Sequence, residues 1–381
     1  MQNKKIKIIT IIGARPQIIK AAALSRAINN LYKDQIQEII VHTGQHYDKT
    51  MSDIFFTELG IPQPTYNLNI GSASHGVQTA LMIEKIEAIL LKEKPSAIVI
   101  YGDTNSTLAS AIAASKIQVP IVHIEAGLRS FDKTMPEEIN RILADHVSTL
   151  LFCPTTTGYN NLIKEGFSTT LTSHPDFNHP NLYHCGDIML DNSLYFRPIA
   201  SQKEEYKQLF GKDFVLCTIH RNTNTDNKEK LTNIFTSLLQ IAKNQRIILP
   251  LHPRTKKMIP QMIDSSLQEQ IFSNKNIEII DPVGYLEMIY LESECSLVIT
   301  DSGGVQKEAY FFEKPCIILR PQTEWIEIVS LGAATLADTN QEKILNAYTN
   351  YLSHPKYQLD TTLFGDGKAA EFMCKTMLEV L

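Results

Sequence analysis

The sequence lacks the signatures of several common enzyme classes. It contains no G-x-G-x-x-G after its first apolar run, no G-x-x-x-x-G-K-[ST] and no G-x-S-x-G. These motifs are typical of dinucleotide dehydrogenases, P-loop enzymes and serine hydrolases, so all three classes are disfavoured. His and Glu residues also do not recur at metal-ligand spacing, and we expect no metal site.

Cysteine and clustered positive charge are also scarce. The six cysteines stand singly, without a C-x-x-C pair, which argues against a zinc site or a disulfide framework. The net charge is -5 and Lys and Arg form no cluster, so a nucleic-acid partner is not expected. The apolar stretch Ile8–Ile12 is too short for a signal peptide or a membrane span, and we expect a cytoplasmic protein without a membrane partner.

What the sequence does contain is a regular alternation of short apolar runs and amphipathic stretches, which favours parallel sheets covered by helices on both faces. A length of 381 residues suggests two domains. We expect α/β architecture, with doubly wound domains over residues 1–187 and 188–365 and a closing helix over 366–381. The strand candidates are Ile6–Ile12, Ile36–Val41, Ala97–Tyr101 and Ile121–Ile124 in the first domain, and Phe214–Ile219, Ile247–Leu251, Ile277–Ile280, Leu297–Thr300 and Cys316–Leu319 in the second.

The strongest site signal follows the strand candidate Leu297–Thr300. There, Asp301-Ser302-Gly303-Gly304 combines a strand end, two glycines that let a ligand approach the backbone, and a helix start whose free amides favour a diphosphate. Glu308 lies one helical turn further on, where it can accept hydrogen bonds from a ribose. The alternative is a turn that is merely tight.

Five residues of the first domain stand after strand candidates or at helix starts. Arg15 and Lys20 can point at an anion near a helix N-terminus, or can simply solvate the helix surface. Asp103 also fits an N-cap, Glu125 an ion pair with a nearby arginine at position 129, and Glu137 an ordinary helix start. Together, the three carboxylates can converge and raise one another's pKa, which suits proton transfer.

Two further strand ends of the second domain carry histidine. His220, beside Arg221, is a candidate phosphate or hydroxyl contact, with a satisfied core histidine as the alternative. His252 follows Ile247–Leu251 in the same way, and a polar loop is an equally good interpretation.

Taken in order, the motifs resemble those of a known family across nearly the whole chain. GARPQIIK, HTGQH, YGDTNSTL, HIEAGLRS, MPEEINR, HRN, HP and DSGG-x-Q-x-E are similar to the motifs of the non-hydrolysing UDP-N-acetylglucosamine 2-epimerases. The resemblance implies two Rossmann-like domains facing a cleft (GT-B-like), a C-terminal helix that crosses back to the first domain, and a homodimer. It also implies a cytoplasmic isomerase that supplies precursors of surface polysaccharides.

The resemblance further implies a mechanism and residue roles. UDP leaves by anti elimination across C1 and C2 to give 2-acetamidoglucal and then adds back with inversion at C2, without a metal or redox cofactor. The matching nucleotide contacts are Arg15, Lys20, Ser302, Gly303, Gly304 and Glu308; the matching acidic residues are Asp103, Glu125 and Glu137; the matching histidine is His220. A second UDP-sugar site, which activates some members, would fall on Gln45, His46, Arg221 and His252.

Two positions depart from the family pattern. Gln17 stands where an acid is common, and Trp325 stands where an arginine contacts the nucleotide. These variants resemble the branch that includes UDP-2,3-diacetamido-2,3-dideoxyglucuronate 2-epimerases, so that sugar is an alternative substrate. The same fold would also suit a hydrolysing 2-epimerase, a GT-B glycosyltransferase or a non-catalytic nucleotide-sugar sensor, because a fold does not fix a function.

Overall fold

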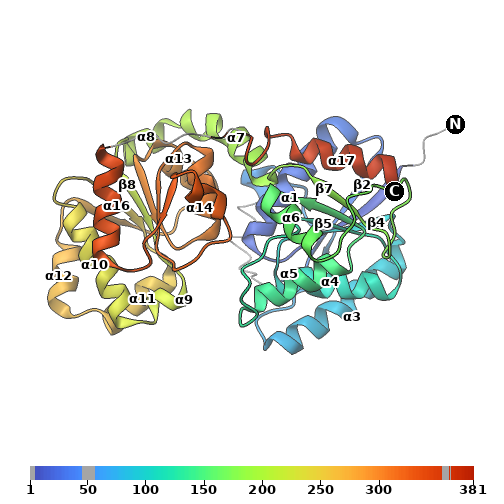
Figure 1. Cartoon of the computed structure of the whole chain (residues 1–381), viewed down its shortest axis with the longest axis horizontal. Coiled ribbons are helices and arrows are strands. Elements are labelled where there is room, and N and C mark those ends of the chain that lie inside the picture. Colours follow the sequence, from blue (N-terminus) through green and yellow to red (C-terminus); the bar gives the residue numbers. More distant parts are fainter. Residues whose placement is uncertain (1–4, 45–55, 354–359, 361) are drawn as a thin grey trace. The chain divides into compact units, whose positions relative to one another are not determined.

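The computed structural model describes residues 5–44, 56–353, 360 and 362–381. The chain divides into two compact units (Figure 1), which are the first unit, Met1–Asn192 with Thr361–Leu381, and the second unit, Ser193–Asp360.

The first unit is built on a seven-stranded sheet in the order β3-β2-β1-β4-β5-β6-β7, with every pairing parallel. The four apolar runs expected as strands form β1, β2, β4 and β5, whereas the short strands β3, β6 and β7 were not expected. The order of the strands reverses between β1 and β4, the place where open parallel sheets bind ligands. The bounds are β1 Ile6–Ile12, β2 Ile36–His42, β3 Tyr66–Asn67, β4 Ala97–Tyr101, β5 Ile121–Ile124, β6 Leu150–Cys153 and β7 Asn181–His184.

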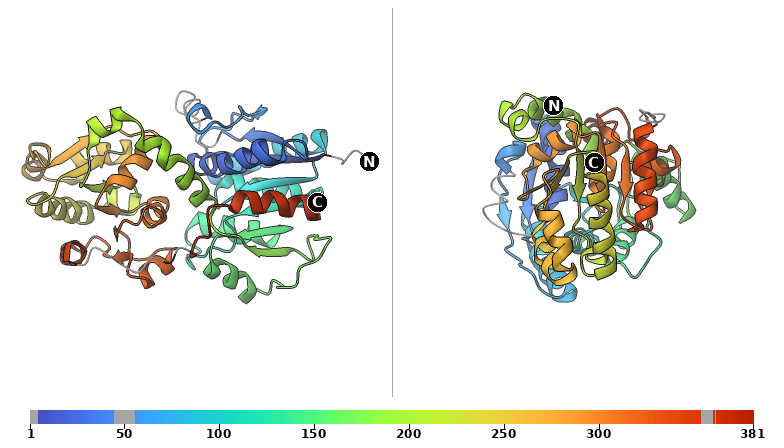
Figure 2. Two further views of the ribbon diagram at one scale, coloured as in Figure 1. Left: turned by 90° about the horizontal axis from the view of Figure 1, so that it is seen from above. Right: turned by 90° about the vertical axis from the view of Figure 1, so that its left-hand side faces the viewer.

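Helices cover both faces of this sheet. Helices α3, α4 and α5 pack in sequence on one face, while α1 and α17 lie side by side on the other (Figures 1 and 2). The C-terminal helix therefore returns to the first unit, as expected. The bounds are α1 Arg15–Ala27, followed by a π-helical turn at Ile28–Tyr32, α3 His75–Glu93, α4 Asn105–Lys116, α5 Pro136–His146, α6 Thr156–Lys164, α7 Ile188–Ser201 and α17 Ala369–Val380.

The returning helix is held by contacts within the first unit. The Asp191 carboxylate accepts hydrogen bonds from the backbone amides of Ala369 (3.1 Å) and Ala370 (2.8 Å) and so caps α17. Nearby, Gly186 and Gly365 have φ of +82° and +87°, and a side chain on Gly186 would meet backbone at 2.7 Å. These positions therefore require glycine.

The second unit has a six-stranded parallel sheet in the order β10-β9-β8-β11-β12-β13. The five expected strands are β8 to β12, and the order reverses between β8 and β11. The strands are β8 Val215–Thr218, β9 Ile247–Pro250, β10 Ile277–Ile280, β11 Leu297–Thr300, β12 Cys316–Ile318 and β13 Ala334–Leu336; the helices are α8 Glu204–Phe210, α9 Asn222–Thr225, α10 Lys228–Ile241, α11 Pro253–Met262, α12 Ser265–Phe272, α13 Tyr285–Glu294, α14 Gly303–Phe311, α15 Ile326–Ser330 and α16 Gln341–Ser353.

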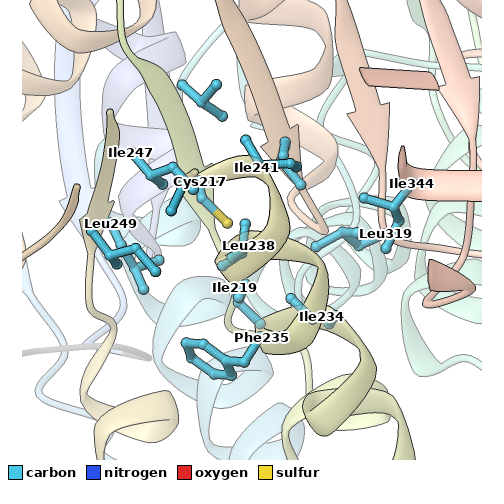
Figure 3. Close-up of a cluster of buried hydrophobic side chains, with 14 of the residues drawn as sticks. Cys217, Ile219, Ile234, Phe235, Leu238, Ile241, Ile247, Leu249, Leu319 and Ile344 are labelled. Atoms are coloured by element: carbon cyan, nitrogen blue, oxygen red, sulfur yellow. The ribbon is translucent and has the colours of Figure 1, made fainter. Parts of the chain in front are cut away.

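The core of the second unit lies between its sheet and the helices α10 and α16. Figure 3 shows Leu238 and Ile241 of α10 beside Cys217 of β8, and Phe235 of α10 and Leu249 of β9 belong to the same cluster. Branched aliphatic side chains at strand positions and at helical spacing explain why both elements form and why they pack together. The expected fold class, two doubly wound α/β domains with a returning helix, is confirmed. Within the described residues, no helix is long and apolar enough to cross a membrane.

Candidate active site

The turn after β11 lies at the point where the strand order of the second sheet reverses. Ser302 is the N-cap of α14 with an extended backbone (φ -81°, ψ 126°), and Gly303 and Gly304 begin the helix. The Ser302 amide donates to Thr300 Oγ1 at 2.9 Å, whereas the first amides of a helix have no partner within it. The helix start is thus suited to an anion.

Gly303 and Gly304 are not explained by the protein's own packing. Neither has the positive φ that favours glycine. A Cβ on Gly303 would meet nothing closer than 3.8 Å, and one on Gly304 nothing closer than 3.7 Å. By contrast, a Cβ on Gly127 would lie 2.2 Å from the Gly158 carbonyl oxygen. Bare backbone at Gly303 and Gly304 is therefore best explained by a molecule that approaches it from outside.

The segment from Arg320 to Trp325 borders this turn. The Trp325 indole N–H donates to the Gly303 carbonyl at 2.9 Å, and the Lys307 ammonium lies 4.5 Å from the centre of the Trp325 ring. Arg320 donates two hydrogen bonds of 2.9 Å to Glu324. Burial would raise the pKa of the Glu324 carboxyl, but the Arg320 guanidinium outweighs burial and the pKa falls below its usual value. At this departure from the family pattern, the Trp325 ring thus lies against the turn, beside the Arg320 guanidinium, whose Nη1 would be 3.8 Å from a Cβ on Gly303.

The Asp301 side chain stabilises the fold by accepting hydrogen bonds from the protein. It is fully buried and accepts hydrogen bonds from the amides of His220 and Arg221 and from the Asn224 side chain, at 3.0–3.2 Å. Its carboxylate therefore joins the ends of β8 and β11.

The two histidines expected at strand ends are neighbours. His220 Nδ1 lies 3.2 Å from Asp301 Oδ1, and the rings of His220 and His252 are 5.6 Å apart. Burial lowers the pKa of the His220 imidazole and Arg221 adds to this effect, whereas the Asp301 carboxylate opposes it. A largely neutral imidazole beside Arg221 can exchange hydrogen bonds with an oxygen-rich ligand.

In the first unit, Gln17 bridges the ends of β1 and β4. Its side-chain oxygen accepts from the amides of Gly13 (2.9 Å) and Ala14 (3.2 Å), and its amide nitrogen donates to the Tyr101 carbonyl and the Thr107 hydroxyl, both at 3.0 Å. All its hydrogen-bonding groups thus serve the fold. The backbone amides just before α1 are therefore occupied by the protein itself.

Lys20 and Glu125 form an ion pair at this edge, with 2.5 Å between Nζ and Oε1. Both side chains are about nine-tenths buried. Gly102 packs against the pair, since a Cβ there would lie 3.2 Å from Glu125 Oε1 and 3.3 Å from Lys20 Nζ. Glu125 itself has φ +72°, a costly conformation for a side-chain-bearing residue and one that is concentrated at functional sites.

Asp103 belongs to a second ion-pair network. Its carboxylate pairs with Arg141, which also donates to Glu138 at 3.0 Å. The Asn140 side chain holds the Asp103 carbonyl at 2.9 Å. The N-cap of α4 is Thr104, so Asp103 is not the helix cap.

Behind these groups, His123 is fully buried between two acceptors. Its Nδ1 lies 2.7 Å from Asp145, and its Nε2 lies 2.8 Å from the Gly102 carbonyl. Arg129 pairs with Asp145 at 2.7 Å and with Glu165, so the ion pair considered between Glu125 and Arg129 is replaced by Lys20–Glu125. Burial alone would raise the pKa of the Asp145 carboxyl, but the effects of His123 and Arg129 are larger together, and the pKa falls below its usual value.

The remaining expected residues are placed as follows. Glu137 is exposed in the first turn of α5, while its neighbour Glu138 is buried in the Asp103 network. Arg15 is the first residue of α1 and is partly exposed. Gln45 and His46 lie outside the described residues.

Sequence reasoning missed Glu138, Arg141 and Asp145. They occupy positions i, i+3 and i+7 of α5, which is one helical face. That face is polar and buried. The spacing of these three residues is visible in the sequence, but charged residues on one face of a helix are ordinarily interpreted as solvent-exposed.

Comparison with known proteins agrees with the geometry. Residues 29–378 match the sequence pattern described as UDP-N-acetylglucosamine 2-epimerase. The chain is 48% identical over 375 residues to the UDP-2,3-diacetamido-2,3-dideoxy-D-glucuronate 2-epimerase of Pseudomonas aeruginosa, covering 97% of this chain and 100% of that protein. It is 43% identical over 373 residues to the UDP-N-acetylglucosamine 2-epimerase of Methanocaldococcus jannaschii, covering 96% and 97%.

Solved structures are similar over the same extent. The crystal structure of the M. jannaschii enzyme in complex with UDP-GlcNAc and UDP gives a TM-score of 0.85 at 43% identity, covering 97% of this chain and 99% of that one. The Neisseria meningitidis UDP-GlcNAc 2-epimerase bound to UDP-GlcNAc gives 0.84 at 29% identity, covering 98% and 100%.

Proposed function

This chain belongs to the UDP-N-acetylglucosamine 2-epimerase family, and we propose that it interconverts UDP-N-acetylglucosamine and UDP-N-acetylmannosamine. The observation that carries the proposal is the start of α14. Gly303 and Gly304 leave the backbone of the helix N-terminus uncovered, although the packing of the protein would accept a side chain at both positions. A nucleoside diphosphate is a ligand that binds to uncovered amides at a helix N-terminus.

The proposed reaction has two reversible halves. A base removes the proton at C2 while the C1–O bond breaks, giving UDP and 2-acetamidoglucal. A proton then adds to the opposite face of C2 while a diphosphate oxygen of UDP bonds to C1. In this scheme, Ser302, Gly303, Gly304 and Glu308 of the second unit hold UDP, with Arg15 and Lys20 of the first unit as additional cations, and donors aimed at the departing diphosphate stabilise its charge.

Proton transfer is assigned to the acidic set Asp103, Glu125 and Glu137. The ion pairs of two of them support this assignment, because Arg141 orients Asp103 and Lys20 orients Glu125 at neighbouring strand ends. Glu137 is exposed and belongs to the set through its place in the first turn of α5. His220 is assigned to the diphosphate, beside Arg221.

The test follows C2 exchange by proton NMR in deuterated water. Deuterium at C2 of a sugar that remains linked to UDP supports the epimerase, whereas release of free N-acetylmannosamine would indicate the hydrolysing reaction and sink the proposal. Asp103→Asn and Glu137→Gln should lose turnover by orders of magnitude and still bind UDP. Retained turnover in both would remove them from the mechanism, and a wild type that binds without turnover would be a sensor.

A second substrate is favoured by one comparison. The relative that acts on UDP-2,3-diacetamido-2,3-dideoxy-D-glucuronate is 48% identical over the chain. We therefore propose this sugar nucleotide as the alternative substrate. Offering the two UDP-sugars separately in the exchange assay distinguishes them by kcat/KM.

We also propose a cytoplasmic homodimer that supplies precursors of surface polysaccharides. Exposed apolar side chains on the two helices that pack against α4, Val77 and Leu81 on α3 and Ile139 and Leu143 on α5, support self-association. Light scattering of the purified protein measures the mass, and a monomer at all concentrations would contradict the proposed homodimer.

A second, activating UDP-sugar site that includes Arg221 and His252 would be seen as a sigmoidal dependence of the rate on the UDP-sugar concentration.

A further inference from the structure

The connection from β5 to α5 contains an aromatic residue in an unusual state. Phe131 has φ +58° and is 78% exposed. A bulky residue in the left-handed region is a conformational outlier, and outliers persist only where the surroundings impose them. Among the described residues, eight non-glycine residues have positive φ, and Phe131 is the one apolar member. Glu125 is another, in the same connection.

The structure that imposes this conformation is a buried carboxylate. Glu138 is 1% exposed and accepts hydrogen bonds from the Ser130 amide and hydroxyl, both at 2.9 Å, and from the Phe131 amide at 3.0 Å. The same carboxylate accepts from Arg141 at 3.0 Å, and Arg141 pairs with Asp103. One network therefore fixes both the Phe131 backbone and the Asp103 carboxylate.

The ring gains little within the protein from this arrangement. Within residues 5–44, 56–353, 360 and 362–381, no ring contact or cation–π contact involves Phe131, and most of its surface is open to solvent. Burial of the ring therefore cannot offset the conformational cost. The connection lies at the carboxyl end of β5, the edge of the sheet where ligands bind.

We propose that Phe131 is a specificity-determining residue that contacts the sugar of the UDP-sugar substrate. An aromatic ring offers a flat apolar surface to the C–H face of a hexose or to the methyl group of its acetamido substituent. The inference rests on the proposed function for the identity of the ligand. Glu138 and Arg141 act as positioning residues, which hold the ring and Asp103 in a fixed relation.

The test uses the full-length chain with Phe131→Ala, Phe131→Gly and Phe131→Tyr. Phe272 provides a matched control, Phe272→Ala, because it is also an exposed phenylalanine, at 57%. We expect Phe131→Ala and Phe131→Gly to raise KM for the UDP-sugar, and its Kd by calorimetry, about tenfold. The Kd of UDP alone should stay within twofold. Phe131→Tyr, which keeps an aromatic ring, should weaken sugar binding less than Phe131→Ala, and Phe272→Ala should resemble the wild type.

Phe131→Gly separates contact from structure. Glycine relieves the strain of φ +58°, so thermal stability should not fall even though sugar binding weakens. Unchanged sugar binding in the Ala and Gly variants, or equal weakening of UDP, would overturn the inference. So would a changed oligomeric state with unchanged constants per site, which would make Phe131 a subunit contact. If the wild type binds a UDP-sugar but exchanges no C2 proton, the proposed function fails while the binding comparison still decides the role of Phe131.

Discussion

Substitution of Gly303 by alanine tests whether bare backbone at the start of α14 exists for a ligand. The added methyl group would have ordinary contacts, with Arg320 Nη1 at 3.8 Å and Glu324 Oε2 and Trp325 Nε1 both at 3.9 Å. The backbone is not in the left-handed region. The fold should therefore accept alanine without loss, and the helix can gain up to about 1 kcal/mol from its higher helix propensity.

The cost should be seen in ligand binding. A phosphate oxygen that accepts from the first amides of α14 must approach the bare edge where the methyl group would stand. Loss of one hydrogen bond to a charged group weakens binding by roughly 1.5–3 kcal/mol, which corresponds to about a 10- to 150-fold rise in the Kd of UDP.

Calorimetry with UDP and thermal unfolding measure the two effects separately. Gly127→Ala is the control for a glycine that the fold requires, because Gly127 has φ +80° and its added Cβ would overlap the Gly158 carbonyl. It should lower the unfolding temperature, whereas Gly303→Ala should not. A Gly303→Ala variant that binds UDP within twofold of the wild type would refute the reasoning.

Three further predictions concern charge and positioning. Lys20→Met should cost up to about 3–5 kcal/mol in urea unfolding because it removes the ammonium that lies 2.5 Å from the buried Glu125 carboxylate. Lys20→Met combined with Glu125→Gln should recover stability but not turnover, and no recovery would argue against a stabilising role of the pair. Trp325→Phe should weaken UDP binding about 2- to 10-fold, because it keeps an aromatic ring beside Lys307 but loses the 2.9 Å hydrogen bond from the indole N–H to the Gly303 carbonyl. An unchanged Kd of UDP would show that this hydrogen bond does not matter for the ligand. Burial raises the pKa of the Asp191 carboxyl to about 7, so the folded state binds the carboxyl proton more tightly than the unfolded chain does. This difference stabilises the folded state by at most about 4 kcal/mol. The stabilisation is present below about pH 4 and is lost as pH rises through about 7. Asp191→Asn should flatten this pH dependence in urea unfolding, and an equal slope in both proteins would contradict the shift.

The strands that carry the site were predictable from the sequence because they are buried and rich in β-branched residues. β1, β4 and β11 are examples, and each was expected within a residue or two of its observed bounds. The strands β6 and β7 were not expected, because their sequences, LLFC and NLYH, contain no β-branched residue.

The polar parts of the site were harder to predict, because sequence patterns do not show which buried charges meet. Glu125 was expected as a site residue, but its partner Lys20 comes from a helix far away in the sequence. His123 stands in an apolar strand, and its role between Asp145 and the Gly102 carbonyl depends on three separate elements. Such partners are set by tertiary structure and are seen only when the sheet is assembled.

The contrast between α1 and α14 shows how one local pattern serves two purposes. Both helices follow a central strand and begin after a glycine or at one, and both sequences predict an anion site. In α1 the third helical residue is Gln17, which binds the preceding amides, and the second is Pro16, which has no amide hydrogen. In α14 the corresponding third residue is Val305, whose apolar side chain cannot accept those amides. The residue two positions beyond the helix start, rather than the glycine, therefore decides whether the helix N-terminus serves the fold or remains available to an anion.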